Sequence, residues 1–295
     1  MEKNNTDGDE VPKDPVKAFE WYLQAAKQGD AHAQCSLGYC YYQGAGVAKD
    51  SKKAAEWYRK AAEQEQVDAQ YNLGLCYAAG DGVTKDLKKA AEWFQKAAEH
   101  GYADAQFNLG WCYGMGSGVT KDVSKATDWY RKAAKQGDAD AQCSLGVCYI
   151  KGNGVPKDLK KAVDWLQKAA KQGNAEAQYF LGACYQNGTG VTKDLKKAAE
   201  LYHMAADQGD SDAQNSLGKC YQNGIGLTKD LTKAAHWYHK AAEQGDADAQ
   251  YSLGWCYEYG AGVTENLTKA IELFHKAAKQ GDTEAQRKLQ DLGQQ

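Results

Sequence analysis

The chain repeats one phrase at a fixed interval. LGYCYYQGAGV at Leu37–Val47 returns six times, as LGLCYAAGDGV, LGWCYGMGSGV, LGVCYIKGNGV, LGACYQNGTGV, LGKCYQNGIGL and LGWCYEYGAGV. Each copy begins 36 residues after the previous one, without insertion or deletion. A period between about 20 and 50 residues is typical of stacked supersecondary units that share one continuous core. The period is therefore a stronger guide to the fold than the length of 295 residues.

Each repeat reads as two helices, which we name A and B. Asp30 is a typical N-cap for an A helix over AHAQCSLGYCYYQ, because its carboxylate can accept an unpaired backbone N–H. Gly44 ends this helix, since a left-handed C-cap costs glycine little. Asp50 caps a B helix over SKKAAEWYRKAAEQ. The pattern predicts an all-α solenoid.

The number of helices follows from the same capping residues. We expect a lone B helix at about residues 14–28, seven A–B pairs of 36 residues, and a short last A helix at about 283–292. The expected domain is a single solenoid over residues 11–293. Residues 1–10 and 294–295 are expected to be tails, the first of them flexible.

One junction between a B helix and the next A helix lacks both the usual glycine and the usual N-cap aspartate. Glu65 replaces the glycine that usually follows a B helix, and Gln66 replaces the usual N-cap aspartate. Tyr102 also replaces a cap, but Gly101 before it is kept. We therefore expect the junction at Glu65 to be the weakest or most distorted seam.

The recurring glycine and cysteine are interpreted as architecture. At about 100° per residue, Leu37 and Cys40 lie on one face, while Gly38 lies to one side, where a missing side chain lets helix B approach. Seven of the nine cysteines share one repeat position, which spaces them too widely for disulfides. We expect all nine to be free thiols in a reducing, cytoplasmic compartment.

The full repeat is A-x-A-Q-x-x-L-G-x-C-Y-x-x-G-x-G-V-x-K-D-x-x-K-A-x-x-W-Y-x-x-A-A-x-x-G-D. It resembles the Sel1-like repeat, a tetratricopeptide-related α-solenoid family, over roughly residues 11–293. The resemblance implies a right-handed α/α superhelix whose A helices line the concave surface. It also implies a non-catalytic scaffold or adaptor for protein partners.

The outward side of the A helices varies from repeat to repeat. We call the positions equivalent to residues 32, 35, 36, 39, 42 and 43 the A face; they lie opposite the constant face on a helical wheel. Aromatic, apolar and amide side chains there suggest a groove for an extended peptide. The predicted partner-binding residues are Tyr39, Tyr42, Tyr71, Asn72, Leu75, Phe107, Asn108, Trp111, Met115, Tyr179, Tyr251, Trp255 and Tyr259.

Two interpretations of this face stay open. The side chains can bind a partner, or they can pack between neighbouring repeats. A mixture is expected, with position 35 more packed and positions 39, 42 and 43 more exposed. Acidic residues dominate position 32, as at Asp68 and Asp104, which favours a partner segment with basic residues.

The B helices carry a second constant face. A tryptophan recurs there in six repeats and is expected in the core, while Lys, Glu, Gln and Arg form the opposite, solvated side. His203, His239 and His275 share one position on this outer side and are interpreted as surface residues, so no metal and no cofactor is predicted.

Other chemistry has weak support. A net charge of −3 gives no basic patch for nucleic acid, and no apolar run is long enough to enter a membrane. Ser216–Lys219 spells S-x-x-K, which permits the alternative of a penicillin-recognising, β-lactamase-like enzyme acylated at Ser216, although S-D-N and K-T-G are missing. A structural repeat protein without a dedicated ligand is a further alternative. The chain is expected to be a monomer, and not an enzyme.

Overall fold

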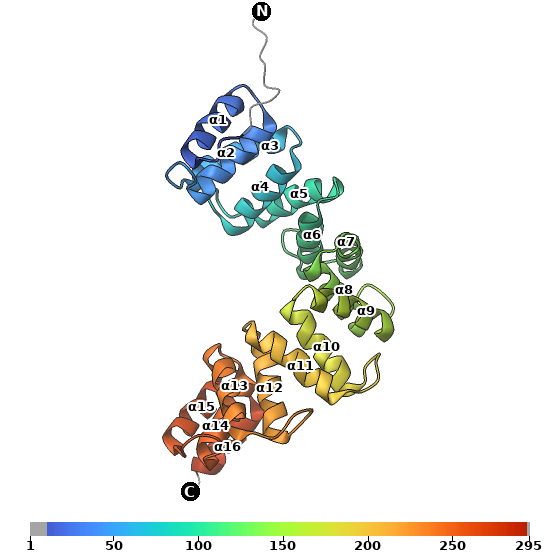
Figure 1. Ribbon diagram of the computed structural model, residues 1–295, viewed down its shortest axis with the longest axis vertical. Coiled ribbons are helices and arrows are strands. Elements are labelled where there is room, and N and C mark those ends of the chain that lie inside the picture. The colour runs from blue at the N-terminus through green and yellow to red at the C-terminus, as the bar shows by residue number, and fades with distance from the viewer. Residues whose placement is uncertain (1–10, 294–295) are drawn as a thin grey trace, which may run out of the picture. The chain divides into compact units, whose positions relative to one another are not determined.

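The computed structural model describes residues 11–293, and over this range the chain contains sixteen α-helices and no strand. The chain forms two compact units, Met1–Ala141 and Gln142–Gln295, here unit 1 and unit 2. Within each unit, each helix packs on the next one along the chain (Figure 1). The single solenoid domain over 11–293 stays a prediction, and the tails at 1–10 and 294–295 lie outside the described residues.

The helices alternate between B and A type. The B helices are α1 (Pro15–Lys27), α3 (Ser51–Glu63), α5 (Leu87–Glu99), α7 (Val123–Gln136), α9 (Leu159–Lys171), α11 (Leu195–Asp207), α13 (Leu231–Glu243) and α15 (Leu267–Lys279). The A helices are α2 (Ala31–Gln43), α4 (Val67–Ala79), α6 (Ala103–Met115), α8 (Ala139–Lys151), α10 (Ala175–Asn187), α12 (Ser211–Asn223), α14 (Ala247–Tyr259) and α16 (Thr283–Gly293). The predicted all-α fold is confirmed, including the lone first B helix and the short last A helix.

The helix boundaries are set by the predicted caps. The Asp30 side chain accepts a hydrogen bond of 2.6 Å from the backbone N–H of Ala33. Gly44 follows α2 in the left-handed region, with φ 80°. Asp50 then accepts from the backbone N–H of Lys53 at 3.0 Å and starts α3. Repetition of these local signals gives helices of nearly constant length.

A missing side chain on each of the seven A helices before α16 allows close packing on the B helix of the same repeat. A Cβ placed on Gly38 would lie 2.7 Å from the Tyr58 ring, which is closer than real Cβ contacts come. Gly74 meets Phe94 and Gly218 meets Tyr238 in the same way, each at 2.6 Å. The predicted role of this glycine is confirmed.

A second glycine forms the contact between repeats. A Cβ on Gly82 would overlap the backbone carbonyl oxygen of Ser51, at the start of the preceding B helix. Gly226 stands against the carbonyl oxygen of Leu195 in unit 2 in the same way. Backbone cannot shift as a side-chain tip can, so this position admits only glycine.

A buried glutamine links the A and B helices in six of the seven A–B pairs. The Gln34 side-chain amide donates to the carbonyl oxygen of Ala26 at 3.2 Å, and its oxygen accepts from Gln64 at 2.8 Å. We call the pair Gln34–Gln64 and its equivalents the glutamine latch. In the next repeat His100 stands where the second glutamine belongs, and the buried Oε1 of Gln70 has no hydrogen-bond partner.

The unusual junction at Glu65 differs from the expectation in one respect. Glu65 adopts a left-handed backbone, with φ 63°, and it is the only non-glycine residue with positive φ among the described residues. The loss of the cap, however, was wrongly predicted, because the Gln66 side chain accepts from the backbone N–H of Ala69 at 2.5 Å. The N-terminus of α6 is the one that lacks a side-chain cap at Tyr102. That this junction is the weakest seam stays a prediction.

The tryptophans of the B helices are less buried than predicted. Trp237 is buried, but Trp57, Trp93, Trp129 and Trp165 are only half-buried. The ammonium group of the lysine three residues later lies 3.6–4.5 Å from each of these five ring centroids. The helical wheel placed these rings correctly beside the core, but each outer edge is covered by a lysine in a cation–π contact.

Candidate partner-binding surface

The rings at position 35 of the A face are largely packed within their own unit. The Tyr71 ring centroid lies 5.9 Å from that of Phe94 and 5.1 Å from that of Tyr102. Its hydroxyl oxygen accepts a hydrogen bond from Asn108 at 3.4 Å. Burial, reinforced by the Asp104 carboxylate, raises the pKa of Tyr71 to about 12. Tyr71 is therefore held in place before any partner binds.

The equivalent residues repeat this arrangement. The Phe107 ring centroid lies 5.7 Å from that of Tyr130 in unit 1. In unit 2 the Tyr179 centroid lies 5.9 Å from that of Tyr202, and the Tyr251 centroid lies 5.6 Å from that of Phe274. Position 35 is therefore packed, as the mixed interpretation expected, but these three rings pack on the B helix of their own repeat and not on a neighbouring repeat.

Positions 39 and 43 are the exposed part of the A face. Tyr39 is 54% exposed, Leu75 39%, Trp111 47% and Met115 65%, all on unit 1. In unit 2 the Tyr259 side chain is 55% exposed and its ring centroid lies 5.2 Å from that of half-buried Trp255. The expected exposure of positions 39, 42 and 43 is confirmed for Tyr39, Leu75, Trp111, Met115 and Tyr259, but it is wrong for Tyr42, which is half-buried. Their role in binding stays a prediction.

The predicted amides differ in availability. Asn108 donates to the carbonyl oxygen of Asp104 at 2.9 Å as well as to Tyr71, so its N–H groups are directed inward. Asn72 instead lines two pockets on the A face of unit 1. The Asn72 side chain also hydrogen-bonds Cys35, so part of its amide is left to hold a peptide backbone.

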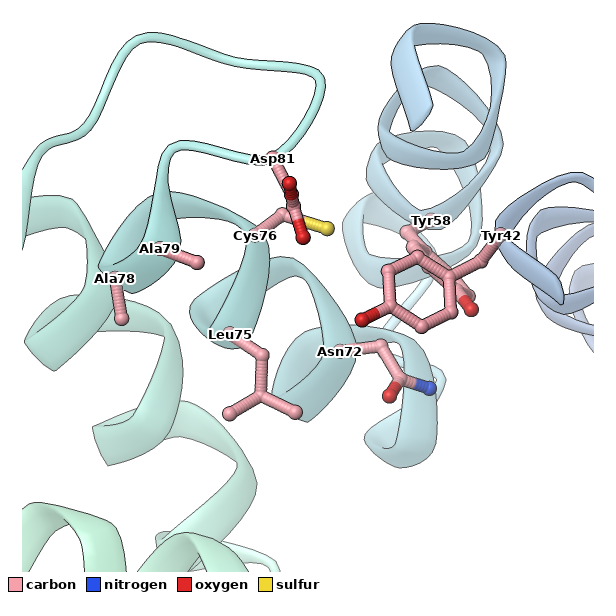
Figure 2. Close-up of a pocket in the computed structure, with 8 residues that line it drawn as sticks. All are labelled: Tyr42, Tyr58, Asn72, Leu75, Cys76, Ala78, Ala79 and Asp81. Carbon is pink, nitrogen blue, oxygen red and sulfur yellow. The ribbon is translucent and has the colours of Figure 1, made fainter. Parts of the chain in front are cut away.

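The first pocket, the Leu75 pocket, has a volume of about 290 Å³. Figure 2 shows the rings of Tyr42 and Tyr58 on one side and side chains of α4 on the other. Its lining residues are Tyr42, Tyr58, Asn72, Leu75, Cys76, Ala78, Ala79 and Asp81. Most of this lining is apolar, and Asp81 contributes a carboxylate from the turn after α4.

The second pocket, the Tyr39 pocket, has a volume of about 330 Å³ and is more polar. Its lining residues are Tyr22, His32, Cys35, Ser36, Tyr39, Cys40, Gln66, Asp68 and Asn72. The side-chain amide of Gln66 donates to the Asp68 carboxylate at 2.7 Å. Asn72 belongs to both pockets, so the two adjoin on unit 1.

Sequence reasoning missed several of these residues. Ala78, Ala79 and Asp81 were not among the predicted binding residues, although they shape the Leu75 pocket. The signal was present in the phrase YAAGD, where the next repeat has YGMGS. The small Ala79 side chain leaves open the space that a methionine would fill, and the next repeat has such a methionine, Met115, at the equivalent position.

The A face of unit 2 has paired charges. The Lys219 ammonium lies 3.4 Å from the carboxylate of Asp248. The Lys288 ammonium lies 2.7 Å from Glu258 and donates to the Tyr259 hydroxyl at 3.0 Å, and these hydrogen bonds raise the pKa of Lys288. The carboxylates of this face are therefore partly neutralised within the chain.

The S-x-x-K sequence is placed on α12. Ser216 is half-buried, and the ammonium of Lys219 is directed to Asp248 rather than being held for Ser216. All nine cysteines are buried thiols outside any disulfide. Burial raises the pKa of Cys112 and of Cys220 to about 11, so these thiols stay protonated at neutral pH. Residues 11–293 contain no group of three or more His, Cys, Asp or Glu side chains that could hold a metal ion.

The repeated, capped helix pairs and their neighbour-to-neighbour packing define an α-solenoid protein. The Sel1 repeat matches residues 5–30, 31–65, 67–102, 103–138, 139–174, 175–210, 211–246 and 247–282. The chain therefore belongs to the Sel1-repeat family. Proteins of this family are generally protein-interaction scaffolds, and their fold is typically non-catalytic.

Two solved structures have the same fold. A protective antigen present in uropathogenic Escherichia coli strains, which displays an SLR fold, is 40% identical with a TM-score of 0.80; the match covers 93% of this chain and 59% of that chain. A Sel1 repeat protein from Oxalobacter formigenes is 36% identical with a TM-score of 0.74, over 97% of this chain and 83% of that chain. This chain thus spans less than two thirds of the E. coli protein. A comparison with curated proteins finds no match.

Within the part of the chain that the structure describes, no helix is long and apolar enough to cross a bilayer.

Proposed function

We propose that the chain is a non-catalytic adaptor that binds a protein or peptide segment on the A face. The observation that carries the proposal is the exposure of Tyr39, Leu75, Trp111 and Met115 on one face of unit 1. Exposed apolar and aromatic side chains gathered on one surface mark interaction sites, and aromatic residues dominate binding energy at interfaces.

The proposal extends to the working state of the chain. We infer that it acts as a monomer in a reducing compartment such as the cytoplasm. Nine buried cysteines outside any disulfide support this inference, because thiols persist where they are kept reduced.

A capture experiment with matched variants tests the proposal. Trp111→Ala changes an exposed A-face ring, and Met204→Ala changes a side chain that is 51% exposed on the outer side of B helix α11. We expect proteins retained by the parent chain from its source lysate to be lost with Trp111→Ala and kept with Met204→Ala. Circular dichroism must first establish that all three chains melt alike. Retention by both variants would contradict binding on the A face.

A further inference from the structure

The two adjoining pockets on unit 1 depend on small residues at one junction between repeats. Leu75 and Ala79 occupy positions where the next repeat has Trp111 and Met115. Cys35 occupies the position where the next two repeats have the packed rings of Tyr71 and Phe107. The backbone is the same in each repeat, so it is the side-chain volume that opens both pockets.

The Leu75 pocket has the size and lining for one apolar side chain. A cavity of about 150 Å³ lined by apolar groups can hold benzene. The Leu75 pocket, at about 290 Å³, therefore has room for a leucine, methionine or isoleucine side chain. Its walls at Leu75, Ala78 and Ala79 are apolar, which favours such a side chain over a polar one.

The charges around both pockets are acidic. Asp81 lines the Leu75 pocket and Asp68 lines the Tyr39 pocket, while no lysine or arginine lines either. The Lys49 ammonium lies 5.3 Å from the centroid of the Tyr42 ring, which lines the Leu75 pocket, and His32 lines the Tyr39 pocket. In unit 2, by contrast, Lys219 occupies the A face beside Asp248. An incoming lysine or arginine would complement the Asp68 and Asp81 carboxylates, which line the two pockets.

Asn72 is placed to hold the main chain of a bound segment. It lines both pockets, and its amide carries two donors and one acceptor oxygen. In an extended segment the side chains stand out from the backbone on alternating sides. When one residue of the segment occupies each pocket, the backbone N–H and C=O groups between them lie near Asn72, where the two pockets adjoin.

We propose that unit 1 recognises an extended segment of a partner protein in which an apolar side chain (Leu, Met or Ile) lies within two residues of a lysine or arginine. The apolar side chain enters the Leu75 pocket, and the cation lies against Asp68 in the Tyr39 pocket. This inference rests on the proposed adaptor function and specifies its ligand.

A random-peptide display library, selected on the immobilised full chain, tests the specificity. The expected result is enrichment of peptides with an apolar residue next to, or one residue away from, a lysine or arginine. The Kd of an enriched peptide is then measured by fluorescence anisotropy. Enrichment of peptides without a basic residue would overturn the proposal.

A matched pair of variants tests the pocket. Leu75→Trp/Ala79→Met fills the Leu75 pocket with the residues of the next repeat, and Ala183→Trp makes a similar change at position 39 of unit 2. Loss of the buried apolar side chain should weaken binding at least about tenfold with the first variant. The second variant should leave Kd unchanged. An unchanged Kd with the pocket-filling variant would overturn the proposal.

A second pair tests the charge. Asp68→Asn should weaken binding about threefold and reduce its dependence on salt, because one exposed ion pair is lost. Asp212→Asn, at the equivalent position in unit 2, should do neither. Equal effects of the two variants would contradict a specific contact at Asp68.

The outcomes separate this inference from the adaptor function. If enriched peptides ignore the pocket variants but lose binding with Trp111→Ala, the adaptor function stands and the pocket assignment fails. If the library yields no peptide, the short-segment ligand is excluded, and capture of a lysate protein by the A face would still support an adaptor. Self-association that the pocket-filling variant abolishes would assign the site to a second copy of the chain and overturn the proposal.

Discussion

The A faces of the two units carry different side chains on the same repeated backbone. Position 39 holds Tyr39, Leu75 and Trp111 in unit 1, all exposed, whereas in unit 2 it holds Val147, Ala183, Lys219 and Trp255. The Leu75 and Tyr39 pockets belong to unit 1, and the ion pair Lys219–Asp248 belongs to unit 2. The caps, the close-packed glycines and the glutamine latch occur in both.

This difference separates the scaffold from recognition. Positions that set helix length and spacing are nearly constant, because each meets the same neighbour in every repeat. A-face positions meet less of the scaffold, so their side chains can change without altering the fold. The predictions below test whether the scaffold is equivalent in the two units, in order of decreasing effect.

The largest effect is expected at the contact between repeats. Gly82→Ala in unit 1 and Gly226→Ala in unit 2 each add a Cβ against a backbone carbonyl oxygen at positive φ (69° and 72°). Each should lower the free energy of unfolding by about 3 kcal/mol. Denaturant unfolding followed by circular dichroism measures this loss.

Gly80→Ala is the control for this pair. It has positive φ too, but the nearest atom to its added Cβ is the Lys85 side chain at 3.2 Å. It should cost only about 1 kcal/mol. An equal cost at Gly80 and Gly82 would mean that backbone conformation, rather than close approach, sets the penalty.

The next effect concerns the glutamine latch. His100→Gln should supply the missing partner of Gln70 and raise the stability of unit 1 by about 1 kcal/mol. Gln208→His should remove the 2.8 Å hydrogen bond to Gln178 and lower the stability of unit 2 by a similar amount. Thermal unfolding checks both variants. No gain from His100→Gln would indicate that the Gln70 oxygen already has a partner.

A comparable or smaller effect is expected at the irregular junction. Glu65→Gly should relieve a left-handed backbone and stabilise the chain by up to about 1 kcal/mol. Gly209→Glu introduces the same strain in unit 2, where an added Cβ would meet nothing within 4 Å. Hydrogen exchange of the flanking helices should slow in the first variant and quicken in the second. Unchanged exchange in both would show that Glu65 carries no strain.

The smallest effect concerns the pH dependence of two kinds of cap. The backbone hydrogen bond from Lys89 lowers the pKa of Asp86, whereas burial raises the pKa of Asp210, both relative to 3.8. Asp86 therefore stabilises the fold above its unfolded pKa, and this is lost as the pH falls through its lower folded pKa. Asp210 contributes stability below its unfolded pKa, and this is lost as the pH rises through its higher folded pKa.

Asparagine variants test these two opposite dependences of stability on pH. Asp86→Asn should flatten the loss of melting temperature below about pH 4, and Asp210→Asn should be tolerated best near neutral pH. Asn174 already caps α10 at the position equivalent to Asp210, accepting from Ala177 at 2.8 Å. Identical pH profiles for the two variants would contradict the difference between the caps.

Much of the fold could be predicted because its signals are local. Asp30, Gly44 and Asp50 act on backbone groups a few residues away, so their spacing alone places the helices. Gln66 was missed as a cap because a longer side chain rarely takes that role. The B-helix tryptophans were predicted to be fully in the core. A helical wheel does not show that a lysine, rather than the core, covers the outer part of each ring.

The candidate site was less predictable because it depends on volumes across helices. Periodicity identified the A face, and Tyr39 and Trp111 proved exposed there. It could not distinguish Tyr71, whose ring is packed, from an exposed tyrosine. The Leu75 pocket exists because small side chains from one helix face rings from two others, which no single-helix pattern contains.

The buried cysteine that the seven A helices before α16 share at one position has a consequence for experiment. Every one of the seven repeats carries a thiol at the same position, shielded by its own pair of helices. Each thiol can react with an alkylating reagent only when its repeat opens. In a stacked array, terminal repeats have one neighbour fewer and open more readily. Alkylation resolved by mass spectrometry would thus record, in one chain and without any mutation, how opening spreads from repeat to repeat.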